Sequence, residues 1–228
     1  RSQKTMAIDK RYIIGIDIGG SKINAILFNS GKVLQSVKIP TPKNRKEFLE
    51  KLEALVKKLI SGAGNKKISG IGCGIAGVLD LEKGVILNAP NLRFLNNFNI
   101  KNWLEKKFGC DVKVDNDARC FTRAEYLYGA GRGYKNIVGI TLGTGVGGGL
   151  VINSKIFYGS FGSAGEVGHT TYYGVEFEDL VSLRSLNKFG FNDPVKAYRL
   201  ARSGDKKAKE VFKKLGGYLG IGLAHIIN

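Results

Sequence analysis

The chain of 228 residues is long enough for one large domain or for two lobes with a buried core. Its hydrophobic content of 43% and its 32 glycines are typical of a globular α/β protein and exclude a disordered chain. We expect no membrane span and no signal peptide, and three unpatterned cysteines (Cys73, Cys110 and Cys120) indicate a reducing, cytoplasmic setting.

The net charge is strongly positive, +17 from 36 basic and 19 acidic residues. Such an excess is compatible with a nucleic-acid or anionic-membrane partner. The lysines, however, are spread along segments with helical spacing, and no basic run is interleaved with aromatic residues. We therefore interpret the charge as a solvated lysine-rich surface and expect no membrane partner. A polyanionic partner such as nucleic acid is the less favoured alternative.

The first half of the chain begins with strands. Apolar, β-branched runs predict strands over residues 12–18, 24–28 and 33–39, which short turns join into an antiparallel meander. Asn44 and Glu47 then form a capping-box-like helix start. The apolar positions of this helix are Phe48, Leu52, Leu55 and Leu59. Further expected elements are a strand over 68–75, loops to about residue 99, a helix over 101–108 and a strand over 112–114.

The second half repeats the opening pattern of two strands around a glycine-rich turn. Its expected elements are a helix over 118–128, strands over 136–142 and 150–152, and mostly helix after Leu180, with Asp193 as an N-cap before Pro194. This internal repeat predicts an α/β fold with two similar lobes around a central cleft. We expect the lobes at residues 12–116 and 117–228, after a disordered leader or cloning remnant at residues 1–11.

Two glycine-rich stretches, Gly72–Gly77 and Gly143–Gly148, match the GxGxxG pattern of dinucleotide-binding loops. That motif requires a helix directly after its last glycine, but strand-like residues follow here, and no P-loop sequence occurs. The glycines instead favour tight turns between paired strands, where successive N–H groups bind anionic oxygens. The candidate phosphate-binding residues are Gly19, Gly20 and Ser21 in the first half and Gly143, Thr144 and Gly145 in the second.

Asp17 lies at the end of the first strand, beside the first of these turns. A carboxylate next to bound phosphate requires a cation between them, so Asp17 is a candidate Mg²⁺ ligand, directly or through water. The alternative is an ordinary hairpin with a structural aspartate.

Several motifs together resemble a known family. The run Asp17–Lys22 (DIGGSK) resembles the DxGGT/S phosphate motif of the actin-like sugar kinases. Five motifs that follow in order are GIAGVLD at 74–80, NAPNL at 88–92, DNDA at 115–118, LGTGVGGG at 142–149 and GEVGH at 165–169. Over residues 12 to about 169 the chain thus resembles the ROK family (repressors, open reading frames and kinases).

The resemblance implies that the two lobes are actin-like (ribonuclease H-like). It also implies an ATP- and Mg²⁺-dependent sugar kinase in which Asp117 is the general base and Lys22 joins the first turn at the ATP phosphates. The sugar-binding residues that it implies are Asn91, Asn116, Asp117, Glu166, His169 and Glu178. Glucose is the expected sugar, with an N-acetylhexosamine, mannose or fructose as alternatives. A non-catalytic sugar-sensing regulator is the alternative of another class. The resemblance also implies a homo-oligomer, and the positive surface would steer ATP toward the protein.

The residues themselves agree with this chemistry. Phosphoryl transfer needs positioning, charge neutralisation and one base for the attacking hydroxyl, and Asp117 beside the Asn116 amide offers that base. The alternative for Asp117 is a helix N-cap, and the alternative for His169 is a structural histidine. His225, in the last apolar segment, is interpreted as structural.

The chain departs from the family's pattern in two places. Most members hold zinc with a cysteine cluster after the GExGH motif, whereas residues 170–177 contain no cysteine. We therefore expect no zinc, and a loop braced by Tyr172, Tyr173 and Phe177 instead. The chain also stops inside an apolar helix at Asn228, where the family continues into an adenosine-binding segment, so we expect a truncated product.

Overall fold

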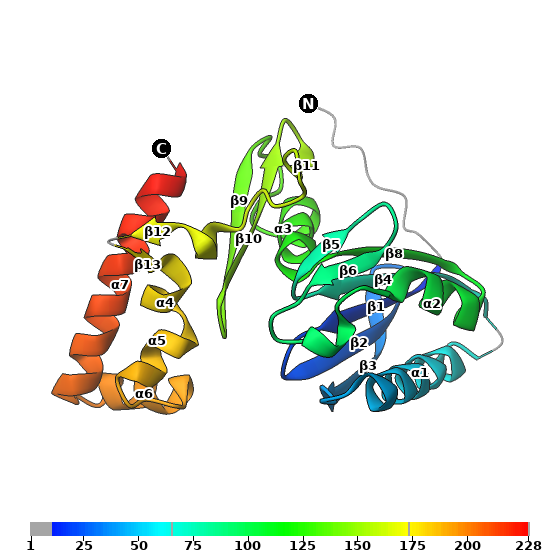
Figure 1. Cartoon of the computed structure of the whole chain (residues 1–228), viewed down its shortest axis with the longest axis horizontal. Coiled ribbons are helices and arrows are strands. Elements are labelled where there is room, and N and C mark those ends of the chain that lie inside the picture. The colour runs from blue at the N-terminus through cyan, green and yellow to red at the C-terminus, as the bar shows by residue number, and fades with distance from the viewer. Residues whose placement is uncertain (1–10, 65, 173, 228) are drawn as a thin grey trace. The chain divides into compact units, whose positions relative to one another are not determined.

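The computed structural model describes residues 11–64, 66–172 and 174–227, which form two compact units (Figure 1). Unit 1 ends at Cys120 and unit 2 begins at Phe121, inside helix α3 (Asp117–Tyr128). The predicted boundary lies slightly earlier, between residues 116 and 117. The predicted α/β class is confirmed. Residues 1–10 of the expected leader lie outside the described residues.

The main sheet of unit 1 has five strands in the order β3-β2-β1-β4-β8. They are β1 (Tyr12–Ile18), β2 (Lys22–Asn29), β3 (Lys32–Pro40), β4 (Ile68–Ile75) and β8 (Asp111–Asn116). The first three form the predicted antiparallel meander, and β4 pairs in parallel with β1 on one side and β8 on the other. Because β1, β4 and β8 run in the same direction, their carboxyl ends lie at one edge of the sheet.

Helix α1 (Arg45–Gly62) packs on β2 and β3 and begins where the sequence predicts. The Asn44 side chain accepts a hydrogen bond from the Glu47 N–H at 2.9 Å, which satisfies one of the unpaired amides of the first turn. The helix buries one apolar face, formed by Phe48, Leu52, Leu55, Val56 and Leu59.

The segment from residue 76 to 99 contains more regular structure than the loops predicted for it. It forms β5 (Val78–Asp80), β6 (Val85–Asn88), the 3₁₀ turn η1 (Arg93–Leu95) and β7 (Phe98–Asn99). These strands pair as a small sheet in the order β5-β6-β7. Very short strands separated by turns carry little periodicity, so the sequence indicated strand-like residues after Gly77 but did not predict this sheet. Helix α2 (Ile100–Phe108) follows directly.

Unit 2 contains the second hairpin that the internal repeat predicts. Strands β9 (Ile137–Leu142), β10 (Val146–Ile152) and β11 (Lys155–Phe157) form an antiparallel sheet. A glycine-rich turn joins β9 and β10, as a glycine-rich turn joins β1 and β2 in unit 1. The turn η2 (Val167–His169) and the strands β12 (Thr171–Tyr172) and β13 (Val175–Glu176) follow.

The rest of unit 2 is helical, as predicted. Its helices are α4 (Phe177–Val181), α5 (Leu183–Lys188), α6 (Pro194–Arg202) and α7 (Lys206–Ile227). Asp193 caps α6 by accepting hydrogen bonds from the amides of Val195 at 2.9 Å and Lys196 at 3.0 Å. A side chain at Gly222 of α7 would overlap the fully buried ring of Phe177, so glycine there lets α7 pack against α4.

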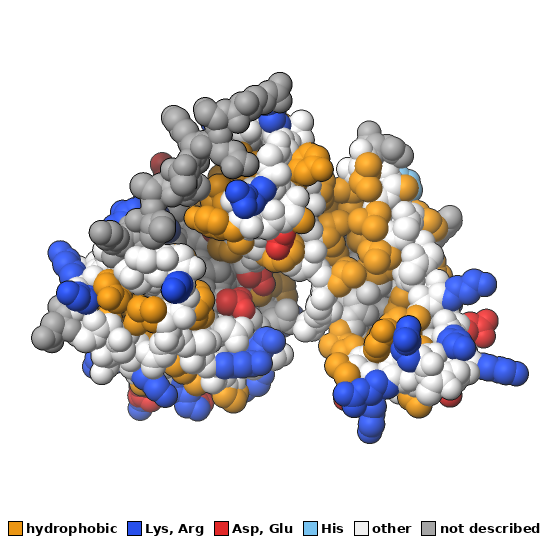
Figure 2. Space-filling model, turned by 180° about the vertical axis from the view of Figure 1, so that it is seen from behind, with side chains coloured by type: hydrophobic (Ala, Val, Ile, Leu, Met, Phe, Trp, Pro, Cys, Tyr) orange, Lys and Arg blue, Asp and Glu red, His pale blue; other side chains and the backbone are white. Residues whose placement is uncertain are grey.

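Lysine and arginine side chains are spread over the surfaces of both units, with no single basic face in view (Figure 2). This distribution agrees with the interpretation of the charge as a solvated surface. Among the described residues, no helix is both long enough and apolar enough to cross a membrane.

The core of unit 1 gives a stability prediction. Leu52 of α1 is fully buried, so Leu52→Ala is expected to lower the free energy of unfolding by about 2–5 kcal/mol through lost burial and a residual cavity. Lys58→Ala, on the exposed face of the same helix, is the matched control and should change it by less than about 0.5 kcal/mol. Urea denaturation followed by circular dichroism measures both values. Equal effects of the two changes would contradict the core assignment.

Candidate functional site

The turn between β1 and β2 carries the first set of predicted phosphate-binding residues. The Gly19 N–H donates to the Lys22 carbonyl oxygen at 3.0 Å, and the Thr41 hydroxyl donates to the Gly19 carbonyl oxygen at 2.7 Å. Among the described residues, no acceptor pairs with the amides of Gly20 and Ser21. Two adjacent backbone donors at the end of a hairpin can bind an anionic oxygen. Lys22 is exposed at the start of β2.

Alternation along the strands places Asp17 on the outer face of the sheet. Ile16 and Ile18 are buried on one face, so the intervening Asp17 points to the other face and is exposed. The register pairs Asp17 with Asn24, whose side-chain amide donates to Asp17 Oδ2 at 3.0 Å. Within the described chain, Oδ1 of Asp17 has no hydrogen-bond partner. One carboxylate oxygen is thus held in place and the other can bind a cation.

Asn91 packs against the first phosphate turn. A Cβ atom on Gly20 would lie 2.6 Å from the Cβ of Asn91, a distance too short for two carbon atoms. The close approach of these two segments therefore requires glycine at position 20. It brings the exposed Asn91 side chain beside the free amides of the turn.

Asn116 and Asp117 lie where β8 passes into α3. Asn116 is buried and is the residue that caps the helix, because its Oδ1 accepts from the Arg119 N–H at 3.1 Å. Its side-chain NH₂ group donates to the Gly77 carbonyl oxygen at 3.2 Å. The predicted sugar-binding amide is therefore already engaged within unit 1. The N-cap alternative for Asp117 does not hold, since Asp117 is the first helical residue.

Asp117 is partly buried, and its Oδ1 accepts from the Ala118 N–H at 2.9 Å. Burial raises the pKa of the Asp117 carboxyl above its ordinary value of 3.8, against the opposing effect of the Ala118 hydrogen bond. The negative charge of Asp17 raises this pKa further, and the positive charge of Arg119 lowers it. A carboxylate with a raised pKa that lies near a second carboxylate is a candidate for proton transfer.

The turn between β9 and β10 carries the second set of predicted phosphate-binding residues. The Gly143 N–H donates to the Gly145 carbonyl oxygen at 2.9 Å, and the Leu183 N–H donates to the Gly143 carbonyl oxygen at 2.9 Å. The amides of Thr144 and Gly145 have no acceptor in the described part of the chain. This turn, like the first, retains two adjacent backbone donors.

Glu178, a predicted sugar-binding residue, contacts the second turn. It is buried, its Oε2 accepts from the Val146 N–H at 3.2 Å, and its Oε1 lies 3.0 Å from Nη1 of Arg184. A Cβ atom on Gly145 would overlap Glu178 Oε2. The carboxylate therefore lies against Gly145 of the turn, and charge-assisted contacts hold it to the first residue of β10 and to Arg184 of α5.

His169 and Glu176 form the exposed part of the same region. Nδ1 of His169 lies 3.1 Å from Oε2 of Glu176, and one ligand atom from each of His169, Glu176 and Glu178 can be chosen within 4.8 Å of the others. An imidazole and two carboxylates are possible ligands of a divalent ion, but both oxygens of Glu178 are already engaged. The expected absence of zinc stays a prediction. Glu166 immediately precedes η2 and is partly buried.

Aromatic packing braces the loop that lacks cysteines. The rings of Tyr172 and Phe177 meet edge to face, with 5.4 Å between their centroids. The His225 ring of α7 packs on Tyr172 at 5.2 Å, and its Nδ1 lies 2.8 Å from the Ile221 carbonyl oxygen. Tyr172 and Phe177 thus make the predicted contact, and His225 has a packing role. Tyr173 lies outside the described residues.

The predicted residues therefore form one set in each unit. The set in unit 1 is Asp17, Gly19, Gly20, Ser21, Lys22, Asn91, Asn116 and Asp117. The set in unit 2 is Gly143, Thr144, Gly145, Glu166, His169 and Glu178.

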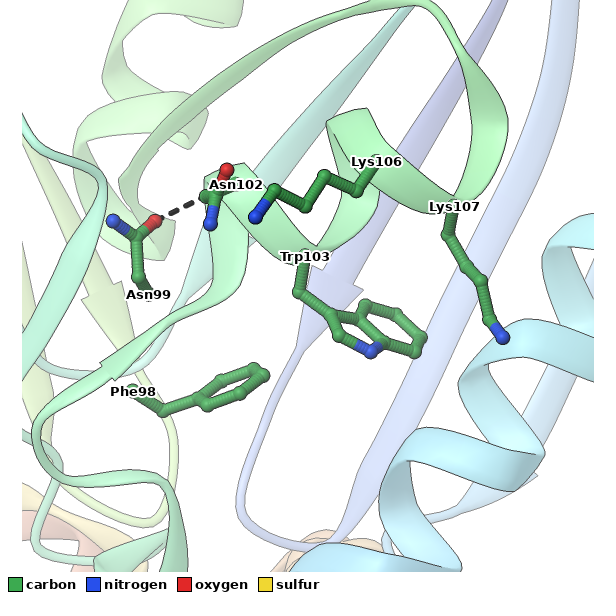
Figure 3. Close-up of a pocket in the computed structure, with 6 residues that line it drawn as sticks. All are labelled: Phe98, Asn99, Asn102, Trp103, Lys106 and Lys107. Carbon is green, nitrogen blue, oxygen red and sulfur yellow. Dashed lines mark hydrogen bonds between the residues drawn. The ribbon is translucent and has the colours of Figure 1, made fainter.

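An open cavity lies elsewhere in unit 1 (Figure 3). It has a volume of about 460 Å³ and is lined by Phe98, Asn99, Asn102, Trp103, Lys106 and Lys107. Figure 3 shows that Lys107 points toward α1, where it pairs with Glu53 at 3.0 Å. None of the predicted site residues lines this cavity.

Sequence reasoning missed three interactions at the site. The ion pair between Asp115 and Arg119 has i,i+4 spacing, a signal that was present in the sequence. The contact of Glu176 with His169 and that of Arg184 with Glu178 join residues without a recognisable spacing. Only the packing of the loops brings these last two pairs together.

Comparison with known proteins settles the family. The sequence profile described as "ROK family" matches residues 13–228. The chain belongs to the ROK family. The predicted family is therefore confirmed.

This ROK protein is similar both to kinases and to regulators, as two relatives show. It is 39% identical over 166 residues to a glucokinase of Halalkalibacterium halodurans, covering 71% of this chain and 50% of the relative. It is 28% identical over 257 residues to a xylose repressor of Caldicellulosiruptor bescii, covering 96% of this chain and 63% of the relative. The chain spans about half the length of the curated glucokinases it matches.

The fold of this chain is similar to that of a solved structure from the same family. A ROK family glucokinase from Streptomyces griseus, in complex with glucose and AMPPNP, matches with a TM-score of 0.80 at 30% identity. The match covers 94% of this chain and 78% of that one.

The contact between Gly20 and Asn91 gives a prediction. Gly20→Ala is expected to lower the free energy of unfolding by about 1–3 kcal/mol, because the new methyl group overlaps the Cβ of Asn91. Gly72→Ala in β4 is the matched control, since a Cβ there meets no atom within 4 Å. Urea denaturation measures both variants, and a neutral Gly20→Ala would contradict the observed contact.

The buried charge of Asp117 gives a second prediction. Between pH 3.8 and its raised pKa, Asp117 holds its proton in the folded state but loses it on unfolding, so its contribution to stability falls as pH rises through this window. Asp117→Asn is therefore expected to raise the free energy of unfolding at pH 7. The gain should vanish as pH falls below 3.8, where the wild-type carboxyl is neutral in both states.

Urea denaturation of Asp117→Asn at pH 7 and at acidic pH tests this sign. The control is Asp111→Asn, because Asp111 begins β8, the strand that leads to Asp117, and its side chain is exposed. A loss of stability in Asp117→Asn at pH 7 would show that the carboxylate is favourable in the folded state, contrary to the prediction.

Proposed function

We propose that this protein is an ATP-dependent kinase that phosphorylates a hexose hydroxyl, with glucose to glucose 6-phosphate as the preferred reaction. The observation that carries the proposal is the Asp117 carboxylate. It has a raised pKa and lies at the carboxyl end of β8, at the sheet edge that also carries Asp17 and the turn with two free amides. A base, a cation ligand and phosphate donors are the groups that phosphoryl transfer requires.

In the proposed reaction, the Asp117 carboxylate accepts the proton of the sugar hydroxyl. The hydroxyl oxygen forms a bond to the γ-phosphorus of ATP while the bond from that phosphorus to the β,γ-bridging oxygen breaks, and ADP leaves. The backbone amides of Gly20 and Ser21 are aligned before the reaction and can donate to phosphate oxygens that gain charge. Lys22 adds a positive charge beside them.

The residues present fit a Mg²⁺ ion at Asp17. Its Oδ1 is available, its Oδ2 is fixed by Asn24, and Mg²⁺ in kinase sites is held by one or two carboxylates, water and phosphate oxygens. When bound, the ion would neutralise part of the phosphate charge. The partial neutralisation would also weaken the repulsion between Asp17 and Asp117.

In unit 2 the proposal assigns Thr144 and Gly145 to phosphate binding, because their amides are free as in the first turn. Glu166 and His169 are proposed to bind sugar hydroxyls, and Glu178 is the third candidate. The Glu178 carboxylate already accepts from the Val146 N–H and pairs with Arg184, so a sugar hydroxyl would share its oxygens with these partners. The similarity to glucokinases supports glucose as the first sugar to test.

A sugar-sensing regulator is the second candidate, favoured by the similarity to a xylose repressor along 96% of this chain. The two candidates differ in one outcome. A kinase converts sugar and ATP to sugar phosphate and ADP, whereas a regulator binds the sugar without turnover.

A coupled ADP-release assay over glucose, N-acetylglucosamine, mannose, fructose and xylose tests the proposal. We expect turnover with at least one hexose, and Asp117→Asn should lower kcat about 10²–10⁴-fold because the proton acceptor is lost. The raised pKa of Asp117 should place the acidic limb of the kcat profile above pH 3.8. Asp111→Asn is the matched control and should keep wild-type kcat. Sugar binding in calorimetry without turnover would support the regulator, and full activity of Asp117→Asn would refute the assigned base.

A further inference from the structure

A buried ion pair joins the second residue before the candidate base, Asp115, to the second residue after it, Arg119. Nε of Arg119 lies 2.8 Å from Oδ1 of Asp115, and Arg119 is 1% exposed and Asp115 8% exposed. Removing two charges from water is costly, and a buried pair is often no more stabilising than apolar residues of similar volume. Stability alone is therefore a weak reason for two charges at this position.

The same side chains fix the backbone that leads from β8 into α3. Oδ1 of Asp115 also accepts from the Asn116 N–H at 2.8 Å, and the Asn116 side chain accepts from the Arg119 N–H at 3.1 Å. The Asn116 side chain in turn donates to the Gly77 carbonyl oxygen at 3.2 Å. Hydrogen bonds thus hold the residues on both sides of Asp117.

Asp117 itself makes a different kind of contact. Its carboxylate accepts from the N–H of the next residue, Ala118, so its direction follows the local backbone. A shift of this backbone would move the carboxylate away from a substrate hydroxyl. A displacement of about 1 Å at a reacting group can cost about 10² in rate.

We propose that the Asp115–Arg119 pair acts in positioning: it holds the Asp117 carboxylate and the Asn116 side-chain amide in the places that catalysis requires. The inference rests on the proposed function of Asp117. The planar guanidinium of Arg119 suits this role because Nε has one fixed direction of donation, whereas a lysine ammonium can rotate. Both residues are buried, so the proposal gives neither of them a contact with substrate.

Three variants separate positioning from simple stabilisation. Arg119→Met leaves Asp115 buried without its partner and should lower both stability and kcat. The double variant Asp115→Asn, Arg119→Met removes both charges and should recover most of the lost stability. We expect its kcat to stay about 10²-fold below wild type, with the sugar KM changed by less than about threefold.

The matched control is Lys107→Met. It removes the partner of Glu53 in an exposed ion pair that joins α2 to α1 in the same unit, and it should keep wild-type kcat. If the double variant recovers kcat together with stability, the pair is only structural and the proposal is overturned.

A measurement without turnover keeps this result separate from the proposed function. Hydrogen exchange should become at least about tenfold faster at the amides of Asn116, Ala118 and Arg119 in the double variant, while the β1 amides keep their protection. If the wild type turns over no sugar, the kinase proposal fails, and hydrogen exchange alone decides the positioning role. Unchanged exchange at these amides in the double variant would overturn the inference.

Discussion

The parallel pairing of β4 with β1 and β8 is the constraint on which the unit 1 site depends. The register places Asp17 opposite Gly74 and Asn116 opposite Ile75, so the ends of β1 and β8 flank the end of β4. Gly74 of β4 lies against the start of α3, since a Cβ there would be 3.4 Å from Asp117 Cα. If the pairing of β1 slipped by one residue, the Asp17 side chain would point into the core and the isoleucine side chains would point into solvent. The burial of Ile14, Ile16 and Ile18 therefore fixes the register.

Three carboxylates lie near this sheet edge in three different environments. Asp115 is buried and neutralised by Arg119, while Asp17 is exposed and held on one oxygen by Asn24. Asp117 is partly buried beside a like charge, and its pKa is raised. Chemically identical groups thus lie in different environments, and the proposed roles of Asp117 as the base and Asp17 as the cation ligand require such a difference.

The two glycine turns show a common local solution. In each hairpin the first glycine amide is used within the turn, at Gly19 and Gly143, and the following two amides have no acceptor among the described residues. What supports the turns differs. Thr41 and Asn91 pack on the first, whereas Glu178 and Leu183 hold the second. The two turns therefore offer similar backbone amides, although different residues hold each turn in place.

The sequence by itself determined the elements with strong periodicity or chemistry. The meander, the Asn44 cap, the Asp193 cap and the glycine hairpins follow from local patterns, because apolar alternation and capping act over a few residues. The family also follows from its motifs. Only the tertiary structure decided that Asn116 rather than Asp117 caps α3, that Glu178 supports a glycine turn, and that Arg119 is buried against Asp115. These features depend on which groups lose water and which partners they meet, and those partners are fixed when strands and loops distant in the sequence pack together.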